Sequence, residues 1–464
     1  MFVKQLYTGC LAEAAYYVES EGEAVIIDPL RETKPYMEMA AERGAKIKYV
    51  LETHFHADFV SGHIDLAKKT GATIVYGPTA EAGYDIKVAE DGEELVIGKI
   101  KLKVLHTPGH TLESTCYLLI DENGKEHAVF TGDTLFIGDV GRPDLAVKSD
   151  LTQEDLASMM YDSLRNKLMS LPDEVILYPG HGAGSSCGKN LSSETVCSIG
   201  QQKKKNYALQ EMSREQFIKE VTEGILPPPQ YFAQDAMKNK NGYDSIDEVL
   251  ERGNNPLSLE AFKIEMEKGA LVVDTRHQQT FVHGFIPESM FLGIEGSFAM
   301  WAGAMISDIN TPILLVCDKD SAEECLVRLA RVGYDNVIGY LEGGYQTWKN
   351  SDEVEWHGIS ISANEFKAIE ESGIDGVIID VRKPGEYETS RLEAAEHYSL
   401  QDLPGMIDQL DVNKKYYLHC RSGYRSMIAL SILKTAGFDN LVEVAGGIVA
   451  IEKAGMEIVE PFEA

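Results

Sequence analysis

The chain has 464 residues, too many for one ordinary hydrophobic core, and about 100–200 residues per domain indicates two to four domains. Hydrophobic residues make up 44% and charged residues 25%, a balance that excludes a disordered or fibrous chain. The 74 acidic residues against 43 Lys and Arg give a net charge of −31, which repels phosphate backbones and excludes nucleic acid as an expected partner.

We expect a cytoplasmic protein that makes no contact with membranes. The first ten residues contain no basic region followed by an apolar run, and no stretch of about 18 apolar residues occurs. The seven cysteines are an odd number spread over a long sequence, which argues against a disulfide framework. Their thiols are therefore expected to be free.

Short apolar runs and turn residues alternate through the first 200 residues. Strands are predicted at residues 23–27, 48–51, 73–76, 101–105, 128–131 and 174–178, with helical stretches between them, as in packed sheets covered by helices. Helical spacing returns over 200–220, and three consecutive prolines at 227–229 then break any helix. The polar segment 235–255 is predicted to be a linker.

Beyond that segment the sequence repeats itself at a period of roughly 105 residues, typical of a duplicated domain. The apolar run that ends in Asp274-Thr-Arg276 matches the one that ends in Asp380-Val-Arg382, and the glycine pair at 343–344 matches the pair at 446–447. Buried-looking strands at 313–316 and 416–419 are each followed by an amphipathic helix. They predict two α/β domains with mostly parallel sheets.

Metal-type ligands gather after the predicted strands of the first half. Seven of the twelve histidines lie between His54 and His181. His54, His56 and Asp58 alternate after the strand at 48–51, and a period of two places them on one side of the chain. Single ligand-type residues follow three later strands: His110, Asp133 and His181. Any one of these histidines alone is explained as a hydrogen-bonded residue at a loop end, but the ordered set predicts a metal site.

This set resembles the motifs of the metallo-β-lactamase superfamily over about residues 1–235. The resemblance implies an αββα sandwich with metal ligands on successive loops. One position departs from the pattern, because Phe59 stands where the superfamily has a histidine that holds a second metal. The second site would keep only Asp58, His181 and the bridging Asp133, so a single metal is expected. The metal-bridging hydroxide of two-metal hydrolases is correspondingly disfavoured.

A single metal suits the persulfide dioxygenase branch of the superfamily, which the sequence also resembles. In that branch two histidines and one carboxylate hold a non-haem iron and leave positions open for substrate and dioxygen. The resemblance implies one Fe(II) per chain, bound by His54, His110 and Asp133. The three remaining ligand-type residues would orient waters and the iron ligands. They are His56, Asp58 and His181.

Two further residues near the predicted site have candidate roles. Arg142, in the Gly-Arg-Pro-Asp stretch at 141–144, offers a bidentate cation for the carboxylate or phosphate of an anionic thiol substrate, or an internal partner for Asp144. Cys187 lies in a loop rich in Gly and Ser after His181. We hypothesise that Cys187 accepts or relays sulfur, and the alternative is a structural cysteine of that loop.

A cysteine-headed loop near the C-terminus reads Cys420-Arg-Ser-Gly-Tyr-Arg425 and leads from a strand at 415–418 into a helix at 427–435. Loop N–H groups, the helix N-terminus and the two arginines would favour a thiolate and hold an anionic persulfide. This is the Cys-x-x-Gly-x-Arg loop of the rhodanese family, a resemblance that covers about residues 360–464.

The rhodanese resemblance implies that Cys420 and Arg425 are catalytic, and that the residues between them bind the substrate. These are Arg421, Ser422, Gly423 and Tyr424. A phosphatase loop would need one more residue between Cys and Arg, and a purely structural Cys420 is the other alternative.

The first copy of the repeat lacks this chemistry. Its matching loop, residues 316–323, is one residue shorter and has no Gly, no Arg and three added carboxylates, which would repel an anionic persulfide. Cys317 stands roughly at the catalytic position. We nevertheless predict that this copy is an inactive domain that serves as a spacer or docking surface.

The sequence therefore predicts an α/β and α+β multidomain fold, in which a metallo-β-lactamase-like αββα sandwich precedes two rhodanese-like α/β domains. The predicted boundaries are 1–235 for the dioxygenase domain, 236–255 for the linker, 256–355 for the inactive rhodanese-like domain and 356–464 for the active one. This order resembles bacterial fusions of persulfide dioxygenase and sulfurtransferase, and it implies a homo-oligomer.

The implied reaction oxidises a low-molecular-weight thiol persulfide, of the glutathione, coenzyme A or bacillithiol type, with O2 to sulfite and thiol. Cys420 would pass sulfane sulfur to sulfite or take it from thiosulfate, and the sequence is compatible with both directions. Two alternatives stay open. One is a thioester hydrolase of the glyoxalase II type with appended rhodanese domains, and the other is a non-enzymatic sulfur carrier or sensor.

Overall fold

The computed structural model describes residues 1–146 and 151–460. The chain divides into two compact units, which are described separately. The first unit comprises Met1–Glu248 together with Val327–Tyr334, and the second comprises Val249–Leu326 together with the residues from Asp335 onward.

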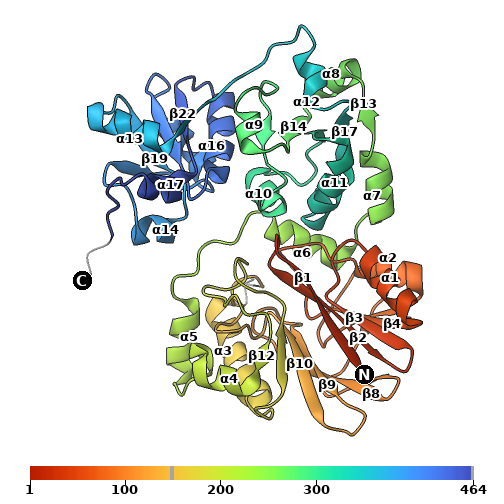
Figure 1. The fold of residues 1–464 in the computed structure, drawn as a ribbon. Coiled ribbons are helices and arrows are strands. Elements are labelled where there is room, and N and C mark those ends of the chain that lie inside the picture. The colour runs from red at the N-terminus through yellow and green to blue at the C-terminus, as the bar shows by residue number, and fades with distance from the viewer. Residues whose placement is uncertain (147–150, 461–464) are drawn as a thin grey trace. The chain divides into compact units, whose positions relative to one another are not determined.

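Two six-stranded sheets form the centre of the first unit (Figure 1). The strands of the first sheet, in spatial order, are β1 (Phe2–Thr8), β2 (Glu13–Ser20), β3 (Glu23–Ile27), β4 (Lys46–Leu51), β5 (Thr73–Tyr76) and β6 (Lys87–Val88). The order in the second sheet is β12 (Cys197–Ser198), β11 (Ile176–Pro179), β10 (Glu126–Gly132), β9 (Thr115–Ile120), β8 (Ile100–His106) and β7 (Glu94–Ile97). The predicted strands at 23–27 and 73–76 have the observed bounds of β3 and β5.

The period of two along a strand explains why both faces of each sheet are covered. On β2, Tyr16 and Val18 pack into the core between the two sheets, while Ala15 and Tyr17 pack into a second core on the outer face. The outer face of the first sheet carries α1 (Lys34–Arg43) and α2 (His63–Thr70).

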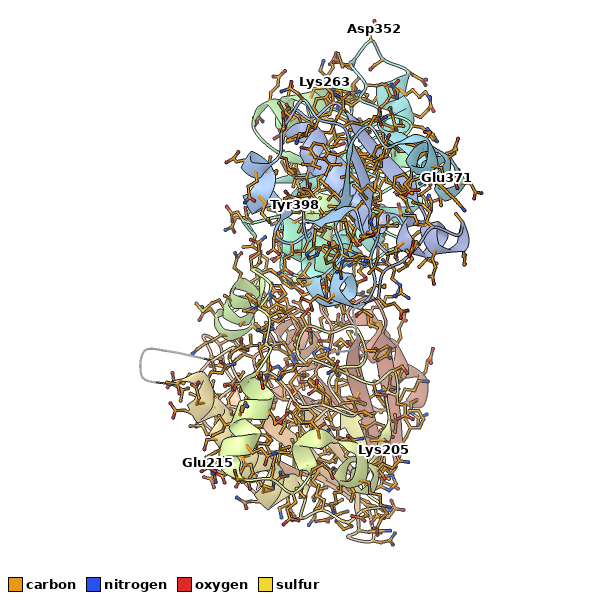
Figure 2. All side chains as sticks on the ribbon, turned by 90° about the vertical axis from the view of Figure 1, so that its left-hand side faces the viewer. Lys205, Glu215, Lys263, Asp352, Glu371 and Tyr398 are labelled. Atoms are coloured by element: carbon orange, nitrogen blue, oxygen red, sulfur yellow. The ribbon has the colours of Figure 1, made fainter. Side chains whose placement is uncertain are left out.

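The second sheet is covered in the same way. Its helices are α3 (Gln153–Ser163), the π-helix η1 (Leu164–Leu168), α4 (Ile199–Lys205), the 3-10 helix η2 (Tyr207–Leu209) and α5 (Arg214–Thr222). Lys205 on α4 and Glu215 on α5, which are labelled in Figure 2, are exposed. The two sheets and their helical covers form an αββα sandwich, which confirms the predicted fold of this part of the chain.

The segment predicted as a linker contains helices α6 (Phe232–Asn241) and α7 (Ile246–Gly253). Its Lys-Asn-Lys-Asn-Gly composition favours irregular backbone, but Phe232, Asp235 and Asn239 recur at helical spacing and are buried. Gly242, with φ +100°, ends α6.

The second unit contains two five-stranded sheets with the same strand order, and all their pairings are parallel. The first is ordered β13 (Pro256–Leu257), β17 (Val337–Leu341), β16 (Ile313–Val316), β14 (Leu271–Asp274) and β15 (Met290–Phe291). The second is ordered β18 (Ile359–Ser362), β22 (Leu441–Ala445), β21 (Tyr416–His419), β19 (Val377–Asp380) and β20 (Ala395–His397). The shared order agrees with the duplication read from the sequence.

Helices connect the parallel strands, as parallel pairing requires. The first copy has α8 (Leu259–Glu267), α9 (Gln278–Phe281), α10 (Phe298–Met305), η3 (Lys319–Ser321), α11 (Ala322–Arg331) and α12 (Tyr345–Lys349). The second has α13 (Ala363–Ser372), α14 (Pro384–Thr389), α15 (Leu403–Met406), η4 (Ile407–Gln409), α16 (Tyr424–Thr435) and α17 (Gly447–Lys453). Within the described ranges, no helix is long and apolar enough to cross a membrane.

Candidate metal centre and sulfur-transfer loop

The ligand-type residues of the first unit all follow the ends of strands. His54 follows β4, His110 follows β8, Asp133 follows β10 and His181 follows β11. β10 and β11 are parallel neighbours, so their carboxyl ends bring Asp133 and His181 together at one edge.

His54, His110 and Asp133 are brought together and are each no more than 2% exposed. One ligand atom from each lies within 4.8 Å of the others, and Asp133 Oδ2 is 3.5 Å from His110 Nε2 and 4.0 Å from His54 Nε2. Both Nε2 atoms and both oxygens of Asp133 lack a hydrogen-bond partner among the described residues. Buried polar atoms are rarely left unpaired, so this arrangement fits a bound cation.

The other ring nitrogen of each histidine is anchored. The Thr53 hydroxyl lies 3.0 Å from His54 Nδ1 and also donates to Asp28, and the backbone oxygen of Arg142 lies 2.8 Å from His110 Nδ1. An acceptor at Nδ1 fixes the proton there and turns the lone pair of Nε2 toward the metal position. Burial, followed by the charges of neighbouring histidines, also lowers the pKa of His54, which keeps that imidazole neutral.

Two glycines permit the close packing of this centre. A Cβ at Gly180 would lie 2.7 Å from Asp133 Oδ1, and a Cβ at Gly141 would lie 2.9 Å from His110 Nδ1. A side chain at either position would displace a candidate ligand, so the sequence needs glycine there.

His56 points to a different set of partners. Its Nε2 lies 3.1 Å from Asp28 Oδ1 and 3.4 Å from Glu52 Oε2. Burial disfavours the imidazolium, but Asp28 and Glu52 outweigh that cost and raise the pKa of His56 well above its ordinary value. Burial in turn raises the pKa of Glu52 to about 7. His56 is therefore held beside the metal position by carboxylates that the sequence reading did not single out.

Asn239 on α6 fixes the loop that carries these residues. Its amide nitrogen donates to the backbone oxygens of His56 and Phe59, each at 2.7 Å, and its side-chain oxygen accepts the backbone N–H of Ser61 at 2.9 Å. Asn239 is 1% exposed. The sequence reading missed this residue because its segment resembled a linker, and the one available signal was its spacing from Phe232 and Asp235.

Asp58 and His181 are brought together with Cys187. One ligand atom of each lies within 4.8 Å of the others, and His181 Nε2 is 3.2 Å from Asp58 Oδ2. Burial, and then the charges of Asp58 and Asp133, raise the pKa of Cys187 well above its ordinary value. The Cys187 thiol therefore lies beside Asp58 and His181, and its charged form is disfavoured there.

Arg142 is occupied by partners within the chain. Its guanidinium donates to both oxygens of Asp144, at 2.6 and 2.7 Å, and to the backbone oxygens of Ser186 and Leu226. It is 7% exposed. This is the internal pairing that the sequence left as an alternative, and a substrate-binding role would require an anion to compete with Asp144.

The cysteine loop of the second unit curls around Cys420, which is 1% exposed. Gly423, with φ +99°, caps α16 and donates its N–H to Cys420 Sγ at 3.2 Å. Because this glycine turns the loop directly into the helix, α16 begins at Tyr424, three residues before the predicted start. A Cβ at Gly447 would lie 2.3 Å from the Cys420 oxygen, so that glycine closes the loop from the other side.

The two arginines of the loop differ in their surroundings. Arg425 pairs bidentately with Glu386, at 2.6 and 2.8 Å, while Arg421 and Ser422 are exposed. Burial opposes the charge of Arg425, but Glu386 and then Cys420 raise its pKa. The hydroxyl of Tyr424 donates to the backbone oxygen of Gly293 at 2.6 Å, so Tyr424 helps to fix the loop.

A buried carboxyl group lies behind Cys420. The Ser426 hydroxyl lies 3.6 Å from Cys420 Sγ and 3.1 Å from Glu443 Oε1, and Ser360 donates to the other oxygen of Glu443 at 2.6 Å. Burial raises the pKa of Glu443 to about 6. Sequence reasoning missed Glu443, because a glutamate within an apolar strand carries no motif.

The matching loop of the first copy has no such cradle for an anion. Cys317 is 2% exposed, and a hydrogen bond with the Cys325 thiol, followed by burial, raises its pKa far above the ordinary value. Asp318 and Asp274 add to this effect. The surroundings of Cys317 therefore disfavour a thiolate.

Comparisons with known proteins agree with the two folds. The model of the metallo-beta-lactamase superfamily matches residues 8–181. The chain is 33% identical over 200 residues to a probable hydroxyacylglutathione hydrolase of Schizosaccharomyces pombe, a stretch that covers 41% of this chain and 73% of the relative. It is 31% identical over 210 residues to the mitochondrial persulfide dioxygenase ETHE1 of Homo sapiens, covering 45% of this chain and 74% of the relative. The chain belongs to the metallo-β-lactamase superfamily.

The chain also resembles the crystal structure of a metallo-beta-lactamase from Staphylococcus aureus, and this match covers more of the chain than the two relatives above do. The TM-score is 0.65 at 32% identity, and the match covers 74% of this chain and 98% of the other. The rhodanese-like domain model matches twice, at residues 258–351 and 362–454.

These matches confirm the predicted architecture of a metallo-β-lactamase domain, homologous to persulfide dioxygenases, with two rhodanese-like domains after it. Membership of the superfamily indicates a metal-binding enzyme. Hydrolases and dioxygenases are similar to this chain at nearly the same identity, so the choice between reactions depends on the chemistry of the site.

Proposed function

We propose that the protein is a non-haem Fe(II) persulfide dioxygenase coupled to a sulfurtransferase. The observation that carries the proposal is the buried set of two Nε2 atoms and one carboxylate, all without hydrogen-bond partners among the described residues. Two histidines and a carboxylate on one face are the ligands that Fe(II) oxygenases use. His54, His110 and Asp133 would hold one Fe(II) per chain.

When bound, the iron would supply Lewis-acid and redox chemistry for the oxygenation of the persulfide sulfur by O2. The overall reaction takes R–S–SH, O2 and H2O to R–SH, sulfite and two protons, so the terminal sulfur is oxidised and O2 is reduced. Thr53 and the backbone oxygen of Arg142 keep both imidazoles oriented by holding their Nδ1 protons. We propose that His56, Asp58 and His181 orient waters and the iron ligands.

The second reaction is placed at Cys420. Its thiolate takes the terminal sulfur of a persulfide and releases R–SH, and sulfite then takes that sulfur to give thiosulfate and restore the thiolate. The opposite direction starts from thiosulfate and is equally balanced. The Gly423 N–H and Ser426 hydroxyl support the sulfur anion, and the exposed Arg421 offers a cation to arriving sulfite.

Several finer assignments belong to the same proposal. Arg425 would assist at Cys420, and Ser422, Gly423 and Tyr424 would bind the substrate there. Cys187 would accept or relay sulfur near the iron. Arg142 would bind the anionic part of the thiol substrate if that anion replaced Asp144 as the partner of the guanidinium. The boundaries 1–235, 236–255, 256–355 and 356–464, the inactivity of the third segment, a homo-oligomer and a cytoplasmic location complete the proposal.

Two rival functions have specific points against them. A thioester hydrolase of the glyoxalase II type is favoured by the hydrolase relatives, but Phe59 removes a ligand of the second metal that such chemistry uses. A sulfur carrier without catalysis would have no use for the unpaired ligand atoms of the first unit.

The deciding experiment uses the full chain, purified without oxygen and loaded with iron. We expect about one iron per chain at the His54 set, and O2 uptake that depends on an added persulfide. His110→Ala should abolish both iron binding and persulfide-dependent O2 uptake. His127→Ala, which replaces a histidine outside the site, should abolish neither. Thioester cleavage without persulfide-dependent O2 uptake would overturn the proposal in favour of the hydrolase. Protein that binds iron but turns over neither substrate would favour the carrier.

A further inference from the structure

The carboxyl group of Glu443 lies inside the second rhodanese-like domain, on strand β22. The period of two along this strand turns Val442 and Val444 into an apolar core, so Glu443 points to the opposite face, toward the cysteine loop. Glu443 is fully buried, and a Cβ at Gly423 would lie 3.2 Å from its Oε1. Its hydrogen-bond partners are hydroxyl and amide groups. Burial of a carboxyl group is costly, so these contacts indicate a role at the loop.

The contacts of the two carboxyl oxygens determine where Glu443 can hold a proton. Gln279 Nε2 donates to Ser360 Oγ at 3.3 Å, and the Ser360 hydroxyl donates to Glu443 Oε2 at 2.6 Å. Because Ser360 gives its proton to Oε2, this oxygen is an acceptor. The proton of a neutral Glu443 therefore lies on Oε1, which is 3.1 Å from the hydroxyl oxygen of Ser426.

The hydroxyl of Ser426 has one proton and two acceptors within reach, Glu443 Oε1 at 3.1 Å and Cys420 Sγ at 3.6 Å. An ionised Glu443 takes this proton, and its negative charge opposes a charge on the sulfur. A neutral Glu443 donates to Ser426 instead, which frees the Ser426 proton for Cys420 Sγ. The Gly423 N–H donates to the sulfur at 3.2 Å in addition. The proton on Glu443 therefore decides whether Sγ receives the second hydrogen bond.

We propose that Glu443 is a positioning residue for sulfur transfer at Cys420, which holds a proton at Oε1 and through Ser426 directs a hydrogen bond to Sγ. This inference rests on the sulfurtransferase function proposed above. When sulfite attacks the outer sulfur of the Cys420 persulfide, its bond to Sγ breaks, the S–S bond of thiosulfate forms, and the electron pair returns to Sγ. The hydrogen bond supports the charge that arrives there. Glu443 takes up a proton from solvent as Sγ becomes charged and releases it when Sγ is loaded again.

The surroundings of Glu443 bring its proton uptake near neutral pH. Burial raises the pKa of Glu443 to about 6, and hydrogen bonds from Ser360 on β18, Ser426 on α16 and Gln279 on α9 limit that rise. Cys420 is the titratable side chain at the end of this series of contacts.

The first copy lacks the same series at the corresponding positions. Ser360 pairs with Glu443 across the neighbouring strands of the second copy, whereas Pro256 pairs with Tyr340 in the first. Neither the serine hydroxyl nor the carboxyl group is present there. The arrangement therefore accompanies the cysteine loop and not the fold as such.

The test measures sulfurtransferase activity of the full chain with thiosulfate and cyanide from about pH 5 to about pH 8. Each variant is compared with the wild type at the same pH, so the protonation of the substrates cancels. The amide of Glu443→Gln donates to Ser426 at every pH and mimics the neutral carboxyl. Its activity should equal that of the wild type at low pH and exceed it at least about 10-fold at high pH, as expected for a hydrogen bond to a charged group. Glu452→Gln, an exposed change on α17, is the control and should show a constant ratio.

Ser426→Ala tests the route through the hydroxyl. This variant should be slower than the wild type at low pH, and adding Glu443→Gln to it should change nothing. A ratio for Glu443→Gln that does not vary with pH would overturn the proposal. An effect of Glu443→Gln that persists without the Ser426 hydroxyl would overturn it as well.

A second measurement needs no turnover. The infrared carboxyl band that disappears in Glu443→Gln reports the proton on Glu443 directly. In Cys420→Ser this band should titrate at lower pH than in the wild type, because the charge of the thiolate is gone. Equal midpoints would contradict the inference even if the enzyme is active. A shifted midpoint in a chain without sulfurtransferase activity would support the contact between the two groups and reject the proposed function instead.

Discussion

The ring of Phe59 lies against the imidazole of His56, with centroids 4.3 Å apart and 33° between the planes. Phe59 is fully buried. Phe59 therefore has a packing role, because its ring contacts the imidazole of His56 while Asp28 and Glu52 contact the Nε2 atom of that imidazole.

Phe59→Ala should destabilise the first unit and weaken iron binding. Removal of a fully buried phenylalanine costs about 3–5 kcal/mol, and the cavity would lie against His56. Phe59→Leu keeps most of the volume and should cost clearly less. Thermal unfolding followed together with iron content checks this prediction, and equal stability of the two variants would contradict it.

Asn239→Ala should weaken iron binding through the backbone of the metal loop. The side chain makes three hydrogen bonds to residues 56–61, and the loss of groups that orient ligands costs about 10–100-fold in metal affinity. Asn241→Ala, at the exposed end of the same helix, is the control and should bind iron normally. Iron affinity measured by chelator competition gives the result, and thiosulfate sulfurtransferase activity should be unchanged in both variants.

Cys420→Ser should abolish sulfurtransferase activity, whereas Cys317→Ser should leave it intact. Cys420 accepts the Gly423 N–H and lies beside Ser426, while a hydrogen bond with Cys325, burial and nearby acidic groups disfavour the thiolate of Cys317. Thiosulfate and cyanide provide the assay. Loss of sulfurtransferase activity in Cys317→Ser would show that the first copy takes part in the reaction, against the prediction.

Glu443 should make the second rhodanese-like domain less stable as the pH rises. Burial raises the pKa of this carboxyl from 4.5 to about 6, so the folded state holds the proton more tightly than the unfolded state. The stabilisation is present below pH 4.5 and is lost as the pH rises through 6, a change of about 2 kcal/mol. The free energy of unfolding of the Glu443→Gln protein should not show this decrease with rising pH. Unfolding of both proteins between pH 4.5 and 7 measures it, and parallel pH profiles would contradict the assignment.

The sequence predicted the residues that follow strands better than it predicted their partners. His54, His110 and Asp133 each follow the end of a strand, which periodicity reveals, but they come together from two sheets: β4 belongs to the first, and β8 and β10 belong to the second with β9 between them. The orientation of His56 toward Asp28 and Glu52 depends on carboxylates distant in the chain, and no local pattern reports such contacts.

Two other differences between the predicted and the observed site also arise from contacts between residues distant in the chain. Arg142 and Asp144 are close in sequence, so their pairing can be predicted, but the hydrogen bond from Arg142 to the Leu226 oxygen spans 84 positions. Asn239 belongs to a segment whose polar composition hides its burial. Composition describes what a segment exposes on average, whereas a single buried amide depends on the surface against which its helix packs.

The paired Asp and Arg after the second strand of each copy have nearly identical geometry in the domain predicted to be active and in the one predicted to be inactive. Arg276 donates from Nη2 to Asp274 and to the Gly284 oxygen, and Arg382 donates likewise to Asp380 and to the Ser390 oxygen. The Asp–Arg pair therefore does not distinguish the copy predicted to be active from the copy predicted to be inactive. A survey of genomes for sulfurtransferase activity should score the residues around the cysteine instead.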